Sequence, residues 1–134
     1  MAFDGIPLKA GGDVNPSRFV TIDTTKNQTV VESNSGDAKI IGVSQEGTKY
    51  APGTNSSTLA AEDGDNLHVH FPGEVCLVQM DAVGCTAGDY LKPDNSGMGV
   101  VASSTNVVGA MALETAAANE KVLAVVLPPG TKAP

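Results

Sequence analysis

Glycine and proline recur along the whole chain, and their distribution constrains the fold more than any other feature of the sequence. The 134 residues include 15 Gly and 8 Pro. Proline removes a backbone donor and glycine weakens helix interiors, so this spacing disfavours long helices. The intervening runs are short and rich in Val and Ile, which favour strands. The sequence therefore predicts many short strands joined by tight turns.

About nine segments have the composition of strands. Two further segments, residues 58–62 and 115–119, are each long enough for a single helical turn. This pattern is typical of an all-β fold, and we expect a small sandwich or a partly open barrel. The expected strands are residues 19–22, 29–32, 38–45, 67–71, 74–80, 90–92, 99–102, 107–113 and 121–127.

Two parts of the chain resemble each other in the order of their apolar segments. The stretch IIGVSQE, which begins at Ile40, corresponds to VVGAMALE, which begins at Val107. Upstream segments match in the same order, with an offset that drifts from 71 to 67 residues. Loops accept insertions more readily than strands do, so such drift is expected between two copies of one unit. We predict a pseudo-repeat of residues 17–46 and 87–116, with Ile41 and Val108 at equivalent buried positions.

The chain is short enough for one domain, and its beginning differs from the rest. Residues 1–16 contain three glycines and two prolines, which leave no room for a regular element. Phe3, Ile6 and Leu8 are nevertheless apolar, which is unfavourable for a free tail. We therefore expect an N-terminal arm at 1–16 that docks on another molecule, and a single β domain at 17–134.

The charge of the chain is unfavourable for nucleic-acid binding. Eight Lys and Arg face 15 Asp and Glu, giving a formal net charge of -7 without a basic cluster, whereas nucleic-acid affinity depends largely on cations. The N-terminus lacks the pattern of a signal peptide. The longest apolar run, residues 122–127, is too short to span a bilayer. We expect a soluble protein made in a cytoplasm, with neither nucleic acid nor membrane as a partner.

The two cysteines and two histidines are the main candidates for site chemistry. Cys76 and Cys85 are nine residues apart, so a disulfide is possible if their strands turn back, but a reducing compartment favours free thiols. His68 and His70 alternate along a strand and share a face, and would bind a metal only with a third ligand from a neighbour. A solvated or intersubunit histidine pair is the favoured interpretation, and we expect no metal site or cofactor.

Other fragments also lack the setting that their chemistry requires. Residues 97–102 fit a dinucleotide-binding pattern but follow a turn and enter a β-branched run instead of a helix. Glu62, Asp63 and Asp65 lack the ligand series of a calcium loop, and a solvated acidic turn is expected. No spacing places a nucleophile beside a base, so the sequence predicts no enzyme class and no catalytic residue.

Six stretches, taken together and in order, resemble the small capsid cement (head decoration) proteins of tailed bacteriophages. No single stretch is diagnostic, but the likeness covers nearly the whole chain. The stretches are residues 6–13 (IPLKAGGD), 16–20 (PSRFV), 40–48 (IIGVSQEGT), 73–77 (GEVCL), 87–92 (AGDYLK) and 128–134 (PPGTKAP).

The resemblance implies an all-β protein that binds the outside of an expanded phage head and stabilises it. Its partner would be the major capsid protein, its location the outer surface of the virion, and its oligomeric state a trimer. Combined with the expected arm, it suggests capsid contacts through Phe3, Ile6, Pro7 and Leu8. It assigns no role to the cysteines or to the histidine pair.

A soluble ligand-binding β module, for instance for carbohydrates, is the alternative from another functional class. Its contacts would be His68, Tyr50 and Tyr90. Sugar sites usually present exposed aromatic platforms, and this chain has no Trp and only two Tyr. A biotin or lipoyl carrier does not fit, because no Lys has the setting that the modified residue needs.

Overall fold

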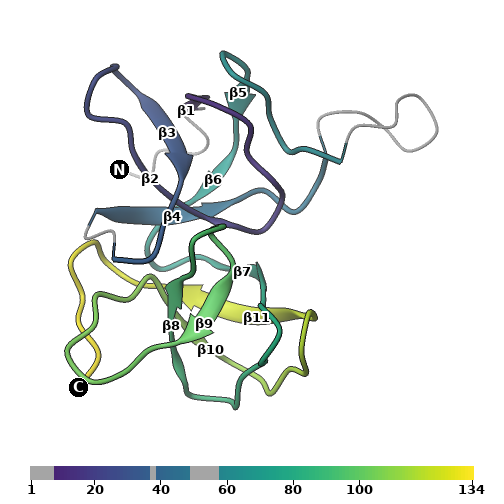
Figure 1. Cartoon of the computed structure of the whole chain (residues 1–134), viewed down its shortest axis with the longest axis vertical. Coiled ribbons are helices and arrows are strands. Elements are labelled where there is room, and N and C mark those ends of the chain that lie inside the picture. Colours follow the sequence, from purple (N-terminus) through teal and green to yellow (C-terminus); the bar gives the residue numbers. More distant parts are fainter. Residues whose placement is uncertain (1–7, 37–38, 49–57) are drawn as a thin grey trace.

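The computed structural model describes residues 8–36, 39–48 and 58–134, which form two stacked, curled β sheets. Each sheet makes a partly open barrel, the first from β1–β6 and the second from β7–β11. Figure 1 shows the sheet of β1–β6 above the sheet of β7–β11. The described residues contain eleven strands and no helix, and therefore no helix able to cross a bilayer. The expected helical turns at 58–62 and 115–119 instead contain the isolated bridges Val14–Ala61 and Cys85–Ala116. The all-β expectation is confirmed.

The first barrel is a six-stranded sheet whose two ends meet. Its order is β5-β1-β3-β2-β4-β6, and only His68 separates β5 from β6 along the chain, so the two ends of the sheet come together and nearly close it. Small apolar side chains fill its interior, including Val14, Val20 and Leu67. The strands are β1 (Leu8–Ala10), β2 (Phe19–Ile22), β3 (Thr29–Glu32), β4 (Ile40–Ser44), β5 (Asn66–Leu67) and β6 (Val69–His70).

The second barrel is a five-stranded sheet in the order β7-β11-β10-β8-β9. A parallel bridge between Met80 and Gly99 joins the end of β7 to β9 and nearly closes the sheet. After β11, the C-terminal tail is held against residues 105–108 by the bridge of Val107 with Lys132. The strands are β7 (Val75–Gln79), β8 (Tyr90–Pro93), β9 (Gly99–Val101), β10 (Ala110–Ala112) and β11 (Lys121–Val126).

The two barrels repeat one arrangement of strands. β2 lies between β3 and β4 in the first barrel, as β8 lies between β9 and β10 in the second, and all four pairings are antiparallel. Hydrogen bonds outside the strands also correspond. The amide of Ser33 donates to the carbonyl of Phe19, as Ala102 donates to Tyr90. The similarity extends beyond the expected 17–46 and 87–116, because β1 corresponds to β7, and β5 and β6 together correspond to β11.

The register of the repeat differs by one residue from the expected one. Gly42 lies opposite Val20, and Ala110 lies opposite Leu91 at the same place in the second barrel. Counting back two residues from each makes Ile40 the counterpart of Val108, and both are buried. Ile41 is only partly buried. The predicted equivalence of Ile41 with Val108 is therefore wrong, and a register shift between β2 and β4 at Val20 and Thr21 accompanies the difference.

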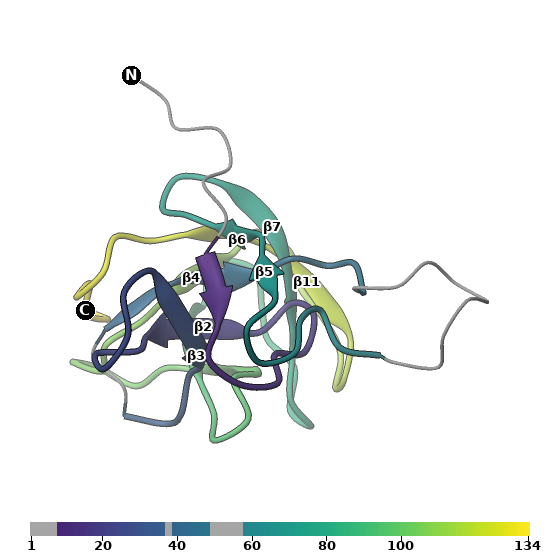
Figure 2. The same ribbon diagram turned by 90° about the horizontal axis from the view of Figure 1, so that it is seen from above.

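The chain enters the first barrel at Leu8 and not at Ser17, so the arm expected at 1–16 is wrong for residues 8–16. β1 pairs in parallel with β3 and antiparallel with β5. Figure 2 looks onto this barrel and shows β1, in purple, among its neighbours. Val14 is completely buried. Residues 1–7 lie outside the described part of the chain.

Side chains from the first barrel complete the core of the second. Phe19, Ile40 and Val43 belong to one apolar cluster with the interior residues of β7, β8, β10 and β11. The amide of Phe19 donates to the carbonyl of Gly97, and the amide of Gln79 donates to the carbonyl of Ser17. Apolar packing and hydrogen bonds therefore both cross the boundary, and the two barrels share one apolar cluster.

We expect Gly42→Ala to destabilise the protein by about 3 kcal/mol or more. A Cβ at Gly42 would lie 2.1 Å from the carbonyl oxygen of His70, so β4 and β6 would have to separate. Gly47→Ala is the matched control, because its Cβ would meet nothing within 4 Å. The control should change stability by less than about 0.5 kcal/mol. Urea unfolding followed by circular dichroism measures both, and equal losses would contradict the close approach of β4 and β6.

Candidate functional site

A cluster of two histidines and two glutamates lies where the first barrel leads into the second. β6 ends at His70, and the turn through Pro72 and Gly73 returns the chain to Glu74 just before β7. The Nδ1 atom of His70 is 3.0 Å from Oε2 of Glu74, and its Nε2 atom is 3.3 Å from Oε1 of Glu46. His68 places its ring edge-on to that of His70, with centroids 5.1 Å apart. The histidine pair expected on one face is thus joined by two carboxylates.

Glu46 also connects the cluster to the second barrel. Its Oε1 atom accepts a hydrogen bond of 3.1 Å from the amide of Leu77 in β7. Partial burial alone would raise the pKa of Glu46, but this amide and the neighbouring His70 hold the pKa below its ordinary value. Glu46 is therefore a carboxylate at neutral pH, fixed by one barrel and directed toward a histidine of the other.

The sequence pointed to His68 and His70 but missed both glutamates. Glu74 follows His70 by four residues across a Pro-Gly turn. Such a turn brings the two side chains together, and this pattern could have identified Glu74 as a third metal ligand beside the histidines. Glu46 had no such signal, because it reaches His70 only through the pairing of β4 with β6.

The residues predicted to contact a capsid fall into two groups. Phe3, Ile6 and Pro7 lie outside the described residues. Leu8 is the first residue of β1, where it pairs with Leu67 and packs against the interior of the first barrel. Leu8 therefore serves the fold of the described chain.

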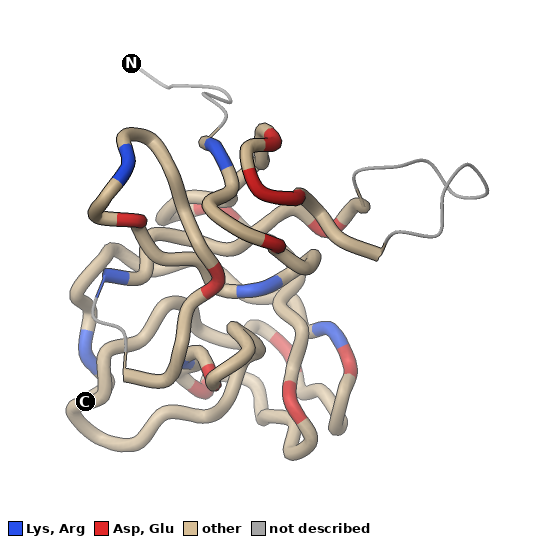
Figure 3. Tube along the Cα trace, turned by 45° about the horizontal axis from the view of Figure 1, so that its top comes forward, with Lys and Arg blue, Asp and Glu red and all other residues tan. Residues whose placement is uncertain are grey.

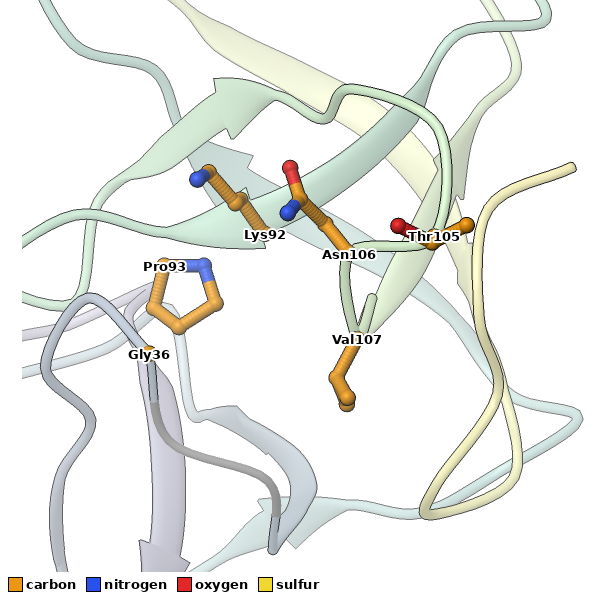
Figure 4. Close-up of a pocket in the computed structure, with 6 residues that line it drawn as sticks. All are labelled: Gly36, Lys92, Pro93, Thr105, Asn106 and Val107. Atoms are coloured by element: carbon orange, nitrogen blue, oxygen red, sulfur yellow. The ribbon is translucent and has the colours of Figure 1, made fainter.

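A small pocket lies between the loop after β3 and the second barrel (Figure 4). Its volume of about 190 Å³ is below the roughly 300 Å³ at which most ligand sites begin. His68 and Tyr90, proposed as sugar contacts, do not line it, and Tyr50 lies outside the described residues. The pocket gives no support to the carbohydrate-binding alternative. Its lining residues are Gly36, Lys92, Pro93, Thr105, Asn106 and Val107.

Acidic and basic residues are interspersed along the chain (Figure 3). The acidic turn before β5 is held by its own side chains. The carboxylate of Asp65 accepts a hydrogen bond from the amide of Glu62. At the equivalent turn of the second barrel, the carboxylate of Glu120 accepts one from the amide of Ala117. Because both turns use a carboxylate to hold their own backbone, the arrangement does not require a bound cation.

Both cysteines are free thiols on the inside of the second barrel. Cys76 is 4% exposed and Cys85 is 9% exposed. Burial raises the pKa of the Cys76 thiol to about 12, and the carboxylates of Glu46 and Glu74 act in the same direction. Burial also raises the pKa of Cys85. A thiol that stays protonated is a poor nucleophile, so neither cysteine is suited to catalysis.

The buried Cys76 thiol should make stability fall at alkaline pH. Above the ordinary thiol pKa of 9.0, the unfolded chain loses this proton while the folded chain keeps it until about pH 12. Stability present below pH 9 is therefore lost at about 1.4 kcal/mol per pH unit above it. Cys76→Ala should show a shallower decline in urea unfolding at pH 8, 9 and 10 under reducing conditions. Identical slopes for the two proteins would refute this assignment.

Comparison with known proteins gives a match in fold and none in sequence. No protein-family model and no curated protein matches the chain. Among solved structures, it is similar to the N base of the head fiber protein gp8.5 of bacteriophage phi29, with a TM-score of 0.55. The match has 17% sequence identity and covers 90% of this chain and 91% of that chain. The match shows that the two chains share a fold over nearly their whole length.

Proposed function

We propose that this protein is a capsid decoration protein that binds the outer surface of an expanded phage head and stabilises it. The observation that carries the proposal is the match of nearly the whole fold to the base of a phage head fiber. A net charge of -7 suits a molecule present in many copies on a crowded shell, because like charges keep neighbours soluble. Its role is to add contact area between capsid subunits.

The segment before β1 is the proposed contact with the major capsid protein. Phe3 and Ile6 each contribute on the order of 1.5 to 3 kcal/mol when fully buried, part of which offsets the ordering of the segment. An extended segment can pair its main chain with a capsid strand while alternate side chains fill pockets. Leu8, the remaining residue of the expected contact, lies in β1 and packs against the first barrel.

The outward face of β7 and β11 is the proposed contact between copies in a trimer. Val75 lies opposite Val125, and Leu77 lies opposite Leu123, so four apolar side chains share one face of the sheet. Leu123 is 39% exposed and Val75 is 52% exposed. Such a face favours association, because burying it removes apolar surface from water.

Leu123→Glu should convert the assembly to monomers without unfolding the chain. A carboxylate at the centre of this face would be desolvated in any contact between copies. Val83→Glu is the matched control, because it adds the same charge at a side chain that is 80% exposed and lies in a turn after β7. Sedimentation velocity measures the oligomeric state, and circular dichroism checks the fold. Equal dissociation in both variants, or none in Leu123→Glu, would argue against this interface.

The proposed function is tested by mixing the purified protein with bare expanded heads and pelleting them. We expect the protein to pellet with the heads at saturable stoichiometry, and the heads to resist heat better when decorated. Unexpanded heads and an unrelated acidic protein of similar size serve as controls. Absence of co-sedimentation with the heads of its own phage would refute the proposal.

A further inference from the structure

The ring of His70 lies between two carboxylates, and a neutral imidazole cannot satisfy both. Its Nδ1 atom is 3.0 Å from Glu74 and its Nε2 atom is 3.3 Å from Glu46. A neutral ring has one N–H donor, so its other nitrogen turns a lone pair toward a carboxylate oxygen. Nε2 is also buried and lacks an aligned hydrogen bond. Either a second proton or a cation resolves this conflict.

His68 favours the cation. Ligand atoms of His68, His70 and Glu74 lie within 4.8 Å of one another. Side-chain rotation brings such a group to the spacing that a metal ion needs, and two imidazoles with one carboxylate form a common zinc ligand set. The two glutamates alone would satisfy both N–H groups of a protonated His70, so a proton would not account for the second imidazole.

The internal repeat shows that the fold does not require histidine at these positions. His68 is 55 residues before Leu123, the same offset that separates the equivalent bridge residues Ala61 and Ala116. By this offset His70 corresponds to Val125. The second barrel thus forms the same strand with Leu and Val, and the histidines of the first barrel serve a purpose other than packing.

We propose that His68, the Nδ1 atom of His70 and Glu74 bind a divalent transition-metal ion such as Zn²⁺, with water as the fourth ligand. Oε1 of Glu46 lies 3.3 Å from Nε2 of His70 and is placed to accept its proton once the ion holds Nδ1. Such a carboxylate partner orients the ring, as is usual for metal-bound histidines. The amide of Leu77 holds Glu46 in place. Because the ligands lie just before β6, at its end and just before β7, the ion fastens the turn that joins the two barrels.

The test uses the tag-free, full-length protein after treatment with a chelator, titrated with zinc at pH 7.5 by calorimetry. We expect one ion per chain, and an increase in Tm of about 5 to 10 °C at a free zinc concentration 100-fold above Kd. Co²⁺ should give the absorption bands of a tetrahedral site and be displaced by zinc.

His68→Leu and His70→Val copy the second barrel and should fold, yet each should weaken zinc binding by more than about tenfold. Glu74→Gln should act similarly. Glu46→Gln keeps an oxygen for Leu77 and should weaken binding by about tenfold. Asp63→Asn, an exposed change of the same charge, is the control and should bind normally.

Three results would overturn the proposal. The first is wild-type protein that binds no zinc, and the second is normal zinc binding by His68→Leu or His70→Val. The third is a stoichiometry of one ion per two or three chains, which would show that the ion is bound between copies of the chain and not within one.

Discussion

Replacement of Phe19 by alanine is expected to lower the free energy of unfolding by about 3 to 5 kcal/mol. The Phe19 side chain is completely buried and belongs to the cluster that holds the interior of the second barrel. A Cβ on Gly109 would lie 2.7 Å from the Phe19 ring, so the ring packs directly on the backbone of the other barrel. Truncation leaves a cavity at the junction of the two barrels. Urea unfolding followed by circular dichroism measures the loss.

Tyr90→Ala is the matched control, because the repeat places Tyr90 at the position of Phe19. Tyr90 is the first residue of β8, as Phe19 is of β2, but it is only partly buried. We expect its loss to cost about 1 to 2 kcal/mol, since partly exposed apolar surface contributes less. Equal destabilisation by the two variants would contradict the special role of Phe19 as the joint between the barrels.

Two N-terminal truncations should differ sharply in stability. Deletion of residues 2–7 ends before β1 and should leave the melting midpoint nearly unchanged. Deletion of residues 2–13 removes β1 and with it at least four backbone hydrogen bonds, to Gln28, to Val30 in β3 and to the stretch before β5, worth about 1 kcal/mol each. It also leaves the buried side chains of Val30 and Leu67 without a covering strand. We expect the longer deletion to unfold the first barrel.

Thermal melting compares the two truncations, and hydrogen exchange locates the loss within the chain. The shorter deletion should reduce pelleting with expanded heads while the fold is intact, which separates the proposed capsid contact from stability. If the longer deletion melts like the full chain, β1 is not needed for the fold, and the expectation of an arm at 1–16 is correct. If the shorter deletion binds heads normally, Phe3 and Ile6 do not contribute to the capsid contact.

Local sequence determined most strands, because their ends are set by residues within the same segment. The expected strands at 19–22 and 29–32 coincide with β2 and β3, and residues 121–127 differ from β11 by one residue. These runs combine β-branched residues with flanking Gly, Pro or polar turns, a signal that does not depend on distant contacts. The fold class followed from the same signal.

β1 could not be predicted, because three residues between glycines and prolines have no strand signal of their own. Leu8–Ala10 is extended only because β3 and β5 supply partners on both sides. The one-residue error in the repeat has a similar cause. The register between β2 and β4 shifts at Val20 and Thr21, and the sequence does not mark such an irregularity.

The candidate site divides in the same way. The sequence alone determined that His68 and His70 share a face, because alternation is a property of any strand. Tertiary structure decided what that face contains. Glu46 reaches His70 because β4 pairs with β6, and it is fixed by the amide of Leu77 in the other barrel. These contacts join residues 24 and 31 positions apart in the chain, and pairing over such distances depends on how the whole sheet closes rather than on any local pattern.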